Sequence, residues 1–243
     1  MATEVGERWL LAGPPFVGEP MWEAVIRRWG SAQVRVVDLL SLGPEIDVAS
    51  QALANELRGR SVVLIAHGTA LPVAWRAARD GGAAGLVLTN GPLTRLDPVA
   101  RAAAALARAA PWSLHPRVAI PALASSLAMR RLVVNPYVMD RDTVVALLGG
   151  SLDTAERRQL VQKYLGSLAG SFDQQAAFDG PTLCVWGDAD RLHPAAIADE
   201  ARRWFPRLRH VAVPGGRLFH PVERPWSLAD AVDDWLAGGM TVT

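Results

Sequence analysis

Six short segments of the chain are apolar at nearly every position, instead of alternating between apolar and polar residues. Strands that are covered on both faces, as in a parallel sheet, have this pattern. The predicted strands are residues 8–12, 33–38, 61–66, 84–89, 182–186 and 210–213.

Longer Ala-rich segments with a helical period separate these apolar runs. In residues 227–236, Leu228, Val232 and Trp235 recur on one face, while the aspartates lie elsewhere. Further helices are predicted at residues 20–29, 48–58, 69–79 and 194–204. Strands that alternate with helices predict an α/β protein with an open, mostly parallel, doubly wound sheet of about six strands.

Residues 92–179 break this alternation, because they contain helical patterns interrupted by prolines and no good strand run. A segment of this length is too long for a structureless loop inside a compact domain. We therefore expect a sheet domain made of residues 1–91 and 180–243, with residues 92–179 inserted as a helical subdomain.

Composition narrows the range of functions. Half of the 243 residues are hydrophobic, and 25 basic residues balance 24 acidic ones, so neither disorder nor attraction to nucleic acid or a membrane is expected. No apolar run is long enough to span a membrane, and residues 1–8 lack the regions of a signal peptide. We expect a cytoplasmic protein, and we interpret its Arg- and Ala-rich composition as that of a GC-rich bacterial genome.

Metal and cofactor sites are not expected either. The five histidines lack metal-type spacing, and Cys184 is the only cysteine. No phosphate-binding glycine-rich loop follows the first predicted strand. We therefore predict no metal and no cofactor.

Four strand-to-helix turns carry a recognisable set of residues. They read LLAGPPF at residues 10–16, VVLIAHGTAL at 62–71, PTLCVWGDADRLHP at 181–194 and VPGGRLFHPVERP at 213–225. In this order they resemble the turns of the capped α/β-hydrolase fold superfamily that hold the oxyanion hole, the nucleophile, the acid and the histidine. The resemblance spans nearly the whole chain. It implies the α/β-hydrolase fold, with residues 92–179 as its cap.

The same resemblance implies a degenerate catalytic triad. Gly68 stands at the position of the serine nucleophile, and Leu218 stands at that of the histidine when the loop is counted without gaps. Only Asp190, at the acid position, is kept. Because the acyl-enzyme route needs both nucleophile and base, ordinary serine hydrolase activity is not expected.

The oxyanion turn departs from the family pattern as well. In the family, one donor is a backbone N–H shortly after a His-Gly pair, and here Pro14 and Pro15 follow Gly13. Proline has no N–H to donate. Loss of one such donor typically costs about 10²–10³ in rate.

Two nearby side chains offer replacements for the lost groups. Thr69 has a hydroxyl one residue past the elbow, although a threonine there also suits a helix cap. His220 lies two residues after Leu218, although it also fits a plain loop histidine. We interpret His193 as a loop residue beside a helix start.

Three functions remain open. The favoured one is a pseudoenzyme that binds a small apolar molecule or a protein partner, and it predicts that Asp190 has no imidazole within hydrogen-bond reach. The second is a non-hydrolytic lyase, cyclase or isomerase that uses Asp190 with His220. The third is a hydrolase with relocated groups, namely Thr69, His220 and Asp190. The sequence leaves the oligomeric state open, and the predicted ligand pocket comprises Pro14, Pro15, Phe16, Gly68, Thr69, Trp112 and Leu218.

Overall fold

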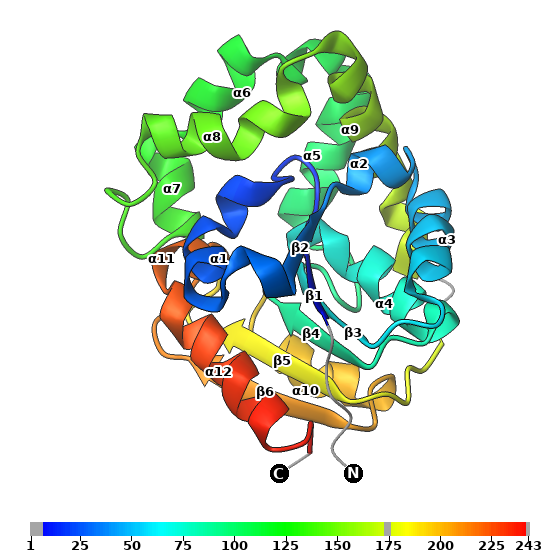
Figure 1. Cartoon of the computed structure of the whole chain (residues 1–243). Helices are drawn as coiled ribbons and strands as arrows, with labels where there is room; N and C mark the ends of the chain where they lie inside the picture. The colour runs from blue at the N-terminus through cyan, green and yellow to red at the C-terminus, as the bar shows by residue number, and fades with distance from the viewer. Residues whose placement is uncertain (1–6, 173–175, 242–243) are drawn as a thin grey trace.

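The computed structural model describes residues 7–172 and 176–241, and its centre is one sheet of parallel strands (Figure 1). The strand order is β2-β1-β3-β4-β5-β6. Each predicted strand is present within about two residues of its expected bounds: β1 (Glu7–Ala12), β2 (Val34–Val37), β3 (Val62–His67), β4 (Gly85–Thr89), β5 (Thr182–Gly187) and β6 (Leu208–Val213). The absence of a signal peptide was inferred largely from residues 1–6, which lie outside the described residues.

The sheet reverses its order at β1, and this reversal positions the site. Leu10 of β1 pairs with Val36 of β2 on one side and with Ile65 of β3 on the other. At such a point the chain leaves the two neighbouring strands toward opposite faces of the sheet, so a crevice forms at their carboxyl ends. The turns that follow β1 and β3 therefore lie next to each other.

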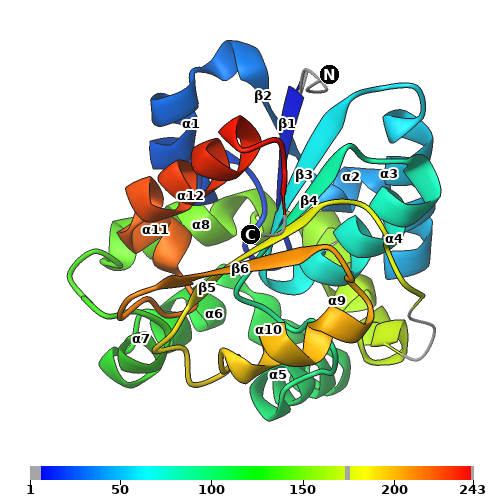
Figure 2. The same cartoon turned by 90° about the horizontal axis from the view of Figure 1, so that it is seen from below.

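Helices cover both faces of the sheet (Figure 2). On one face lie α1 (Glu23–Trp29) and α12 (Pro225–Ala237), and on the other α3 (Ile46–Leu57), α4 (Leu71–Gly81) and α10 (Ala196–Glu200). Leu228, Val232 and Trp235 of α12 are buried, as their period predicts. Short elements complete this part of the chain: η1 (Glu19–Met21), η2 (Ser31–Gln33), α2 (Leu39–Leu42), η3 (Gly68–Ala70), η6 (Ala201–Arg203) and α11 (His220–Glu223).

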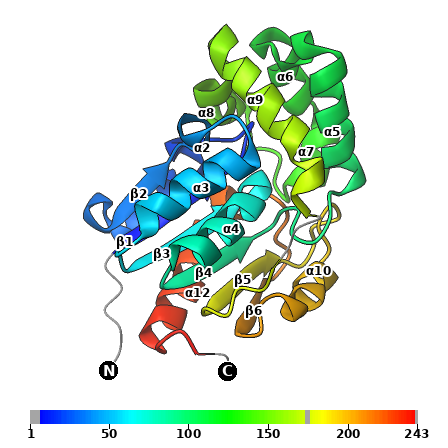
Figure 3. The ribbon, with the colours of Figure 1, turned by 90° about the vertical axis from the view of Figure 1, so that its right-hand side faces the viewer.

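A group of helices between β4 and β5 lies at the end of the molecule opposite the start of β1 (Figure 3). We call it the helical layer, and its members are α5 (Pro98–Ala109), η4 (Pro111–Leu114), α6 (Pro116–Leu123), α7 (Ser126–Leu132), α8 (Arg141–Leu152), α9 (Ala155–Ser167) and η5 (Ala169–Phe172). The described residues between 92 and 179 include no strand. The division of the chain into domains at these positions stays a prediction, and residues 173–175 of this segment lie outside the described part.

No helix in the described part of the chain is long and apolar enough to cross a membrane.

Candidate functional site

A cavity of about 310 Å³ lies where the turns after β1, β3 and β5 meet the helical layer. Its walls are mainly proline, leucine, alanine and phenylalanine side chains. Of the predicted pocket residues, it includes Pro14, Pro15, Phe16, Gly68, Thr69 and Leu218. The helical layer supplies most of the remaining wall: Ala100, Ala103, Leu106, Ser113, Leu114, Leu123, Leu132, Leu165 and Leu168.

The turn after β3, which the resemblance identifies with a nucleophile elbow, has a glycine at its tip. Gly68 has a φ of 63°, in the left-handed region that favours glycine. Its N–H donates to the carbonyl of Asn90 (3.0 Å), and a Cβ added at Gly91 would lie 2.5 Å from the Gly68 oxygen. A Cβ added at Gly68 itself would meet no atom within 4 Å. Space for a nucleophile is therefore present beside the cavity, but the side chain is not.

The turn after β1 offers little to a negatively charged oxygen. Pro14 and Pro15 have no N–H, and the N–H of Phe16 donates to the carbonyl of Gly13 (3.0 Å). The Gly13 N–H donates to the His67 carbonyl (3.2 Å). The amides of residues 13–16 are thus absent or already bonded within the protein.

Thr69 joins the two turns. Its Oγ1 donates a hydrogen bond to the Pro14 carbonyl (2.7 Å), and its own carbonyl accepts one from the hydroxyl of Tyr164 in α9 (2.9 Å). A threonine whose proton is held by a carbonyl has no base to activate it. The structure places Thr69 in the cavity wall, where its hydroxyl serves as a tie between the elbow and the β1 turn.

His220 is buried at the start of α11 and does not line the cavity. Neither ring nitrogen makes a hydrogen bond of normal geometry among the described residues, although the backbone of Val185 lies close enough to favour the protonated ring. Burial lowers the pKa of His220 to about 4, against the opposing charge of Asp190, so the ring is neutral at pH 7. Leu218, which the resemblance places at the histidine position, lies in the cavity wall. The hydrogen bond between His220 and Asp190 that relocated catalysis would need is not made.

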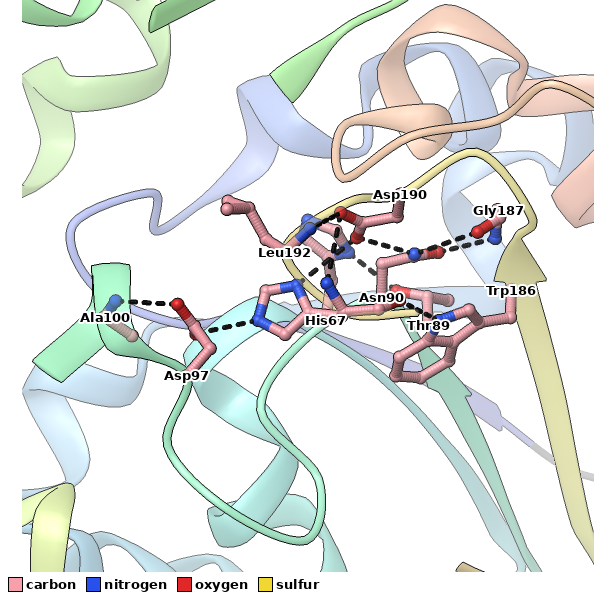
Figure 4. Close-up of polar contacts among 10 residues, drawn as sticks. His67, Thr89, Asn90, Asp97, Ala100, Trp186, Gly187, Asp190 and Leu192 are labelled. Atoms are coloured by element: carbon pink, nitrogen blue, oxygen red, sulfur yellow. Dashed lines mark hydrogen bonds and ion pairs between the residues drawn. The ribbon is translucent and has the colours of Figure 1, made fainter. Parts of the chain in front are cut away.

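A different histidine contacts Asp190. His193 Nδ1 lies 3.3 Å from Oδ2 of Asp190, and Nε2 lies 3.1 Å from Oδ2 of Asp97. Figure 4 labels these two aspartates. The favoured function predicts no imidazole within hydrogen-bond reach of Asp190, and this prediction is wrong. His193 does lie in the loop before α10, as predicted, but its side chain is 5% exposed and lines the cavity, which the sequence did not indicate.

Local hydrogen bonds hold the loop of His193 in place. Oδ1 of Asp190 accepts from the N–H groups of Leu192 (2.9 Å) and His193 (3.2 Å), which folds the loop back over the carboxylate. The indole N–H of Trp186, in β5, donates to the His193 carbonyl (2.7 Å). The imidazole is therefore fixed beside Asp190 by its own backbone.

Asn90 and Asp97 complete this cluster. Asn90 directly follows β4, accepts from the Gly187 N–H (2.7 Å) and donates to Oδ2 of Asp190 (2.8 Å). Asp97 precedes α5, and its Oδ1 accepts from the N–H of Ala100 (2.9 Å), as in a helix N-cap. We call Asp97, His193 and Asp190 the carboxylate–imidazole row.

The row carries charge at pH 7. Burial alone would lower the pKa of His193, but hydrogen bonds to Asp190 and Asp97 and their charges outweigh it and raise the pKa to about 9. The ring is then an imidazolium that donates to both carboxylates. Among the described residues, no group of three or more His, Cys, Asp or Glu side chains is arranged to hold a metal ion.

Trp112 lies elsewhere than predicted from the sequence, and neither Asn90 nor Asp97 was found from it. Trp112 is 67% exposed and lines a separate hollow with His115 and Arg158, because its short helix η4 turns this side chain away from the cavity. Asn90 could have been found from its place right after a buried strand, where functional residues of such sheets gather. Asp97 gives no signal beyond that of a helix cap.

Comparison with known proteins supports the fold. No family model matches the chain. The magnesium-chelatase 30 kDa subunit of Rhodobacter capsulatus is 32% identical over 81 residues, which are 33% of this chain and 27% of that protein. The match thus spans about a quarter of that relative's length.

Solved structures resemble the chain over nearly its full length. A thermophilic esterase from Thermogutta terrifontis has a TM-score of 0.70 at 22% identity, covering 98% of this chain and 92% of that one. An α/β hydrolase fold protein from Burkholderia ambifaria has a TM-score of 0.70 at 22% identity (95% and 91% covered), and the epoxide hydrolase CorEH has 0.66 at 18% (96% and 91% covered). These likenesses confirm what the four turns predict: the protein has the α/β-hydrolase fold.

Proposed function

We propose that this protein is a non-hydrolytic member of its fold that binds a small apolar molecule in the cavity beneath the helical layer. The observation that carries the proposal is Gly68, which faces the cavity with open space where a nucleophile would stand. The volume of about 310 Å³ falls at the lower end of small-molecule pockets. In this proposal the helical layer acts as the cap that encloses the ligand.

Several absences argue jointly against the acyl-enzyme route. Gly68 supplies no hydroxyl nucleophile, and Leu218 supplies no general base. The two prolines after Gly13 supply no N–H to bind an oxyanion. His220 is neutral but buried away from the cavity, and Thr69 holds its proton against the Pro14 carbonyl. Each loss alone would reduce the rate, and together they remove every step of the route.

Hydrolysis is tested with p-nitrophenyl acetate and butyrate. We expect turnover no faster than that of heat-denatured protein, and we expect Gly68→Ser to restore none, because base and oxyanion donor are also missing. Turnover by the unmodified chain that Asp190→Asn abolishes would contradict the proposal. Appreciable activity of the Gly68→Ser variant would show that a base does reach the elbow.

Binding is tested with a matched pair of substitutions in α5. Ala103 and Ala102 are neighbouring exposed alanines, but only Ala103 lines the cavity. We expect cyclohexylmethanol or 2-phenylethanol to raise the Tm of the unmodified chain and of Ala102→Trp, and to raise that of Ala103→Trp less, because its indole occupies the cavity. Equal responses of the two variants would place binding elsewhere.

A second function is supported by the carboxylate–imidazole row. A protonated His193 at the cavity wall is a candidate general acid for a lyase or isomerase. Product analysis separates the two functions: a bound molecule that NMR recovers unchanged after long incubation supports binding, whereas a rearranged product lost in His193→Gln supports the acid.

A further inference from the structure

The cavity has one polar corner, and its charge is negative. Among the described residues, the titratable ones in the cavity wall are Asp97 and His193, and neither lysine nor arginine lines it. Behind them stands Asp190, whose side chain is fully buried. Two carboxylates and one imidazolium give the row a formal charge of −1 even when His193 is protonated.

This charge lies where water does little to screen it. The side chains of Asp97 and His193 are 9% and 5% exposed. The start of α5 and the backbone N–H groups of Leu192 and His193 stabilise the carboxylates, but they add no positive charge. An excess charge at a buried wall favours a ligand group of opposite sign and repels one of the same sign.

His193 cannot reverse this preference by binding an anion. An imidazolium has two N–H donors, and here one points to Asp190 and the other to Asp97. Thr69 donates its hydroxyl proton to Pro14, and the β1 turn has no spare amide at residues 13–16. Ser113 supplies a single hydroxyl in the wall, which falls short of the paired donors that a carboxylate needs.

We propose that the cavity selects apolar amines: the hydrocarbon body fills the leucine- and proline-lined space, and the ammonium group lies against Asp97. The inference deepens the proposed binding function and rests on it. Each carboxylate oxygen accepts more than one hydrogen bond, so Asp97 can keep its present partners while it binds the ammonium group. A carboxylate ligand with the same hydrocarbon body is rejected by the charge of the row.

Three probes with one hydrocarbon body test the charge preference: cyclohexylmethylamine, cyclohexylmethanol and cyclohexanecarboxylate. Calorimetry at pH 7 is expected to rank the amine first, the alcohol second and the carboxylate last, with at least about tenfold between amine and carboxylate. Equal affinities, or the carboxylate ranked first, would overturn the inference and leave the binding function standing. Binding of none of the three would count against both.

Asp97→Asn removes the one carboxylate that the described part of the chain contributes to the cavity wall. Asparagine caps a helix about as well as aspartate, so α5 should keep its start. We expect the preference for amine over alcohol to fall severalfold, with the affinity for the alcohol unchanged.

Asp140→Asn is the matched control. Asp140 also caps a helix of the helical layer, through the Thr143 N–H (2.8 Å), but it does not line the cavity. Asp97→Ser is a second uncharged cap if the asparagine variant does not fold. An unchanged preference in the folded variant would overturn the inference.

Discussion

Two neighbouring loops each contain a buried histidine, and the pKa values of the two imidazoles shift in opposite directions. His193, after β5, lies between two carboxylates, and its pKa is raised to about 9. His220, after β6, makes no hydrogen bond of normal geometry among the described residues, and burial lowers its pKa to about 4. At pH 7 one ring is therefore charged and the other is neutral. In this chain the histidine at the cavity is His193, in the loop after β5. The resemblance to the fold superfamily instead places the histidine in the loop after β6.

The largest expected effect comes from removing the charged ring. His193→Leu leaves Asp97 and Asp190 buried without their shared cation, and breaking a buried ion pair in this way costs about 3–5 kcal/mol. Urea denaturation should show a free energy of unfolding lower by about that amount. A loss below about 1 kcal/mol would mean that the row contributes little to stability.

The titration of both imidazoles should change the free energy of unfolding with pH. The folded pKa of His193, about 9, exceeds the ordinary value of 6.5, so its stabilisation is complete below pH 6.5 and is lost as the pH rises through 9. The folded pKa of His220, about 4, is depressed, so stability falls as the pH drops from 6.5 toward 4. Each difference corresponds to about 3 kcal/mol.

Unfolding curves measured from pH 4 to 10 test this dependence. The decline in stability at alkaline pH should be lost in His193→Leu, and part of the decline at acid pH should be lost in His220→Leu. If the stability of His193→Leu still fell between pH 7 and 10, another titratable group would be responsible for the decline.

The smallest expected effect comes from the neutral ring at pH 7. Replacing an unpartnered buried polar group with an apolar one of similar size is nearly neutral or stabilising. His220→Leu should therefore change the free energy of unfolding at pH 7 by less than about 1 kcal/mol. This variant is the matched counterpart of His193→Leu, and equal losses in the two would contradict the contrast between the loops.

The sequence predicts the strands of the sheet well, because buried parallel strands are apolar at consecutive positions. It also locates the turn at Gly68, since the flanking strand and helix bound this turn. These features depend on local pattern, which a single sequence contains.

The carboxylate–imidazole row lies beyond such reasoning. Asp97 and His193 are 96 positions apart, and they meet only because the start of α5 packs over the loop after β5. No residue pattern near either one indicates the other. Trp112 illustrates the same limit: its side chain belongs to a short helix whose orientation depends on how the layer packs.

The tie between Tyr164 and Thr69 has a consequence for how a molecule reaches the cavity. Tyr164 is fully buried, so its hydrogen bond fastens α9 to the elbow inside the protein. Next to it, α5 packs against α9 and borders solvent: Leu106 lines the cavity and is still 52% exposed. The wall at α9 is thus anchored and the wall at α5 borders water. A ligand that enters and leaves along α5 does not need to break the hydrogen bond between Tyr164 and Thr69, so α5 marks the expected access route to the cavity.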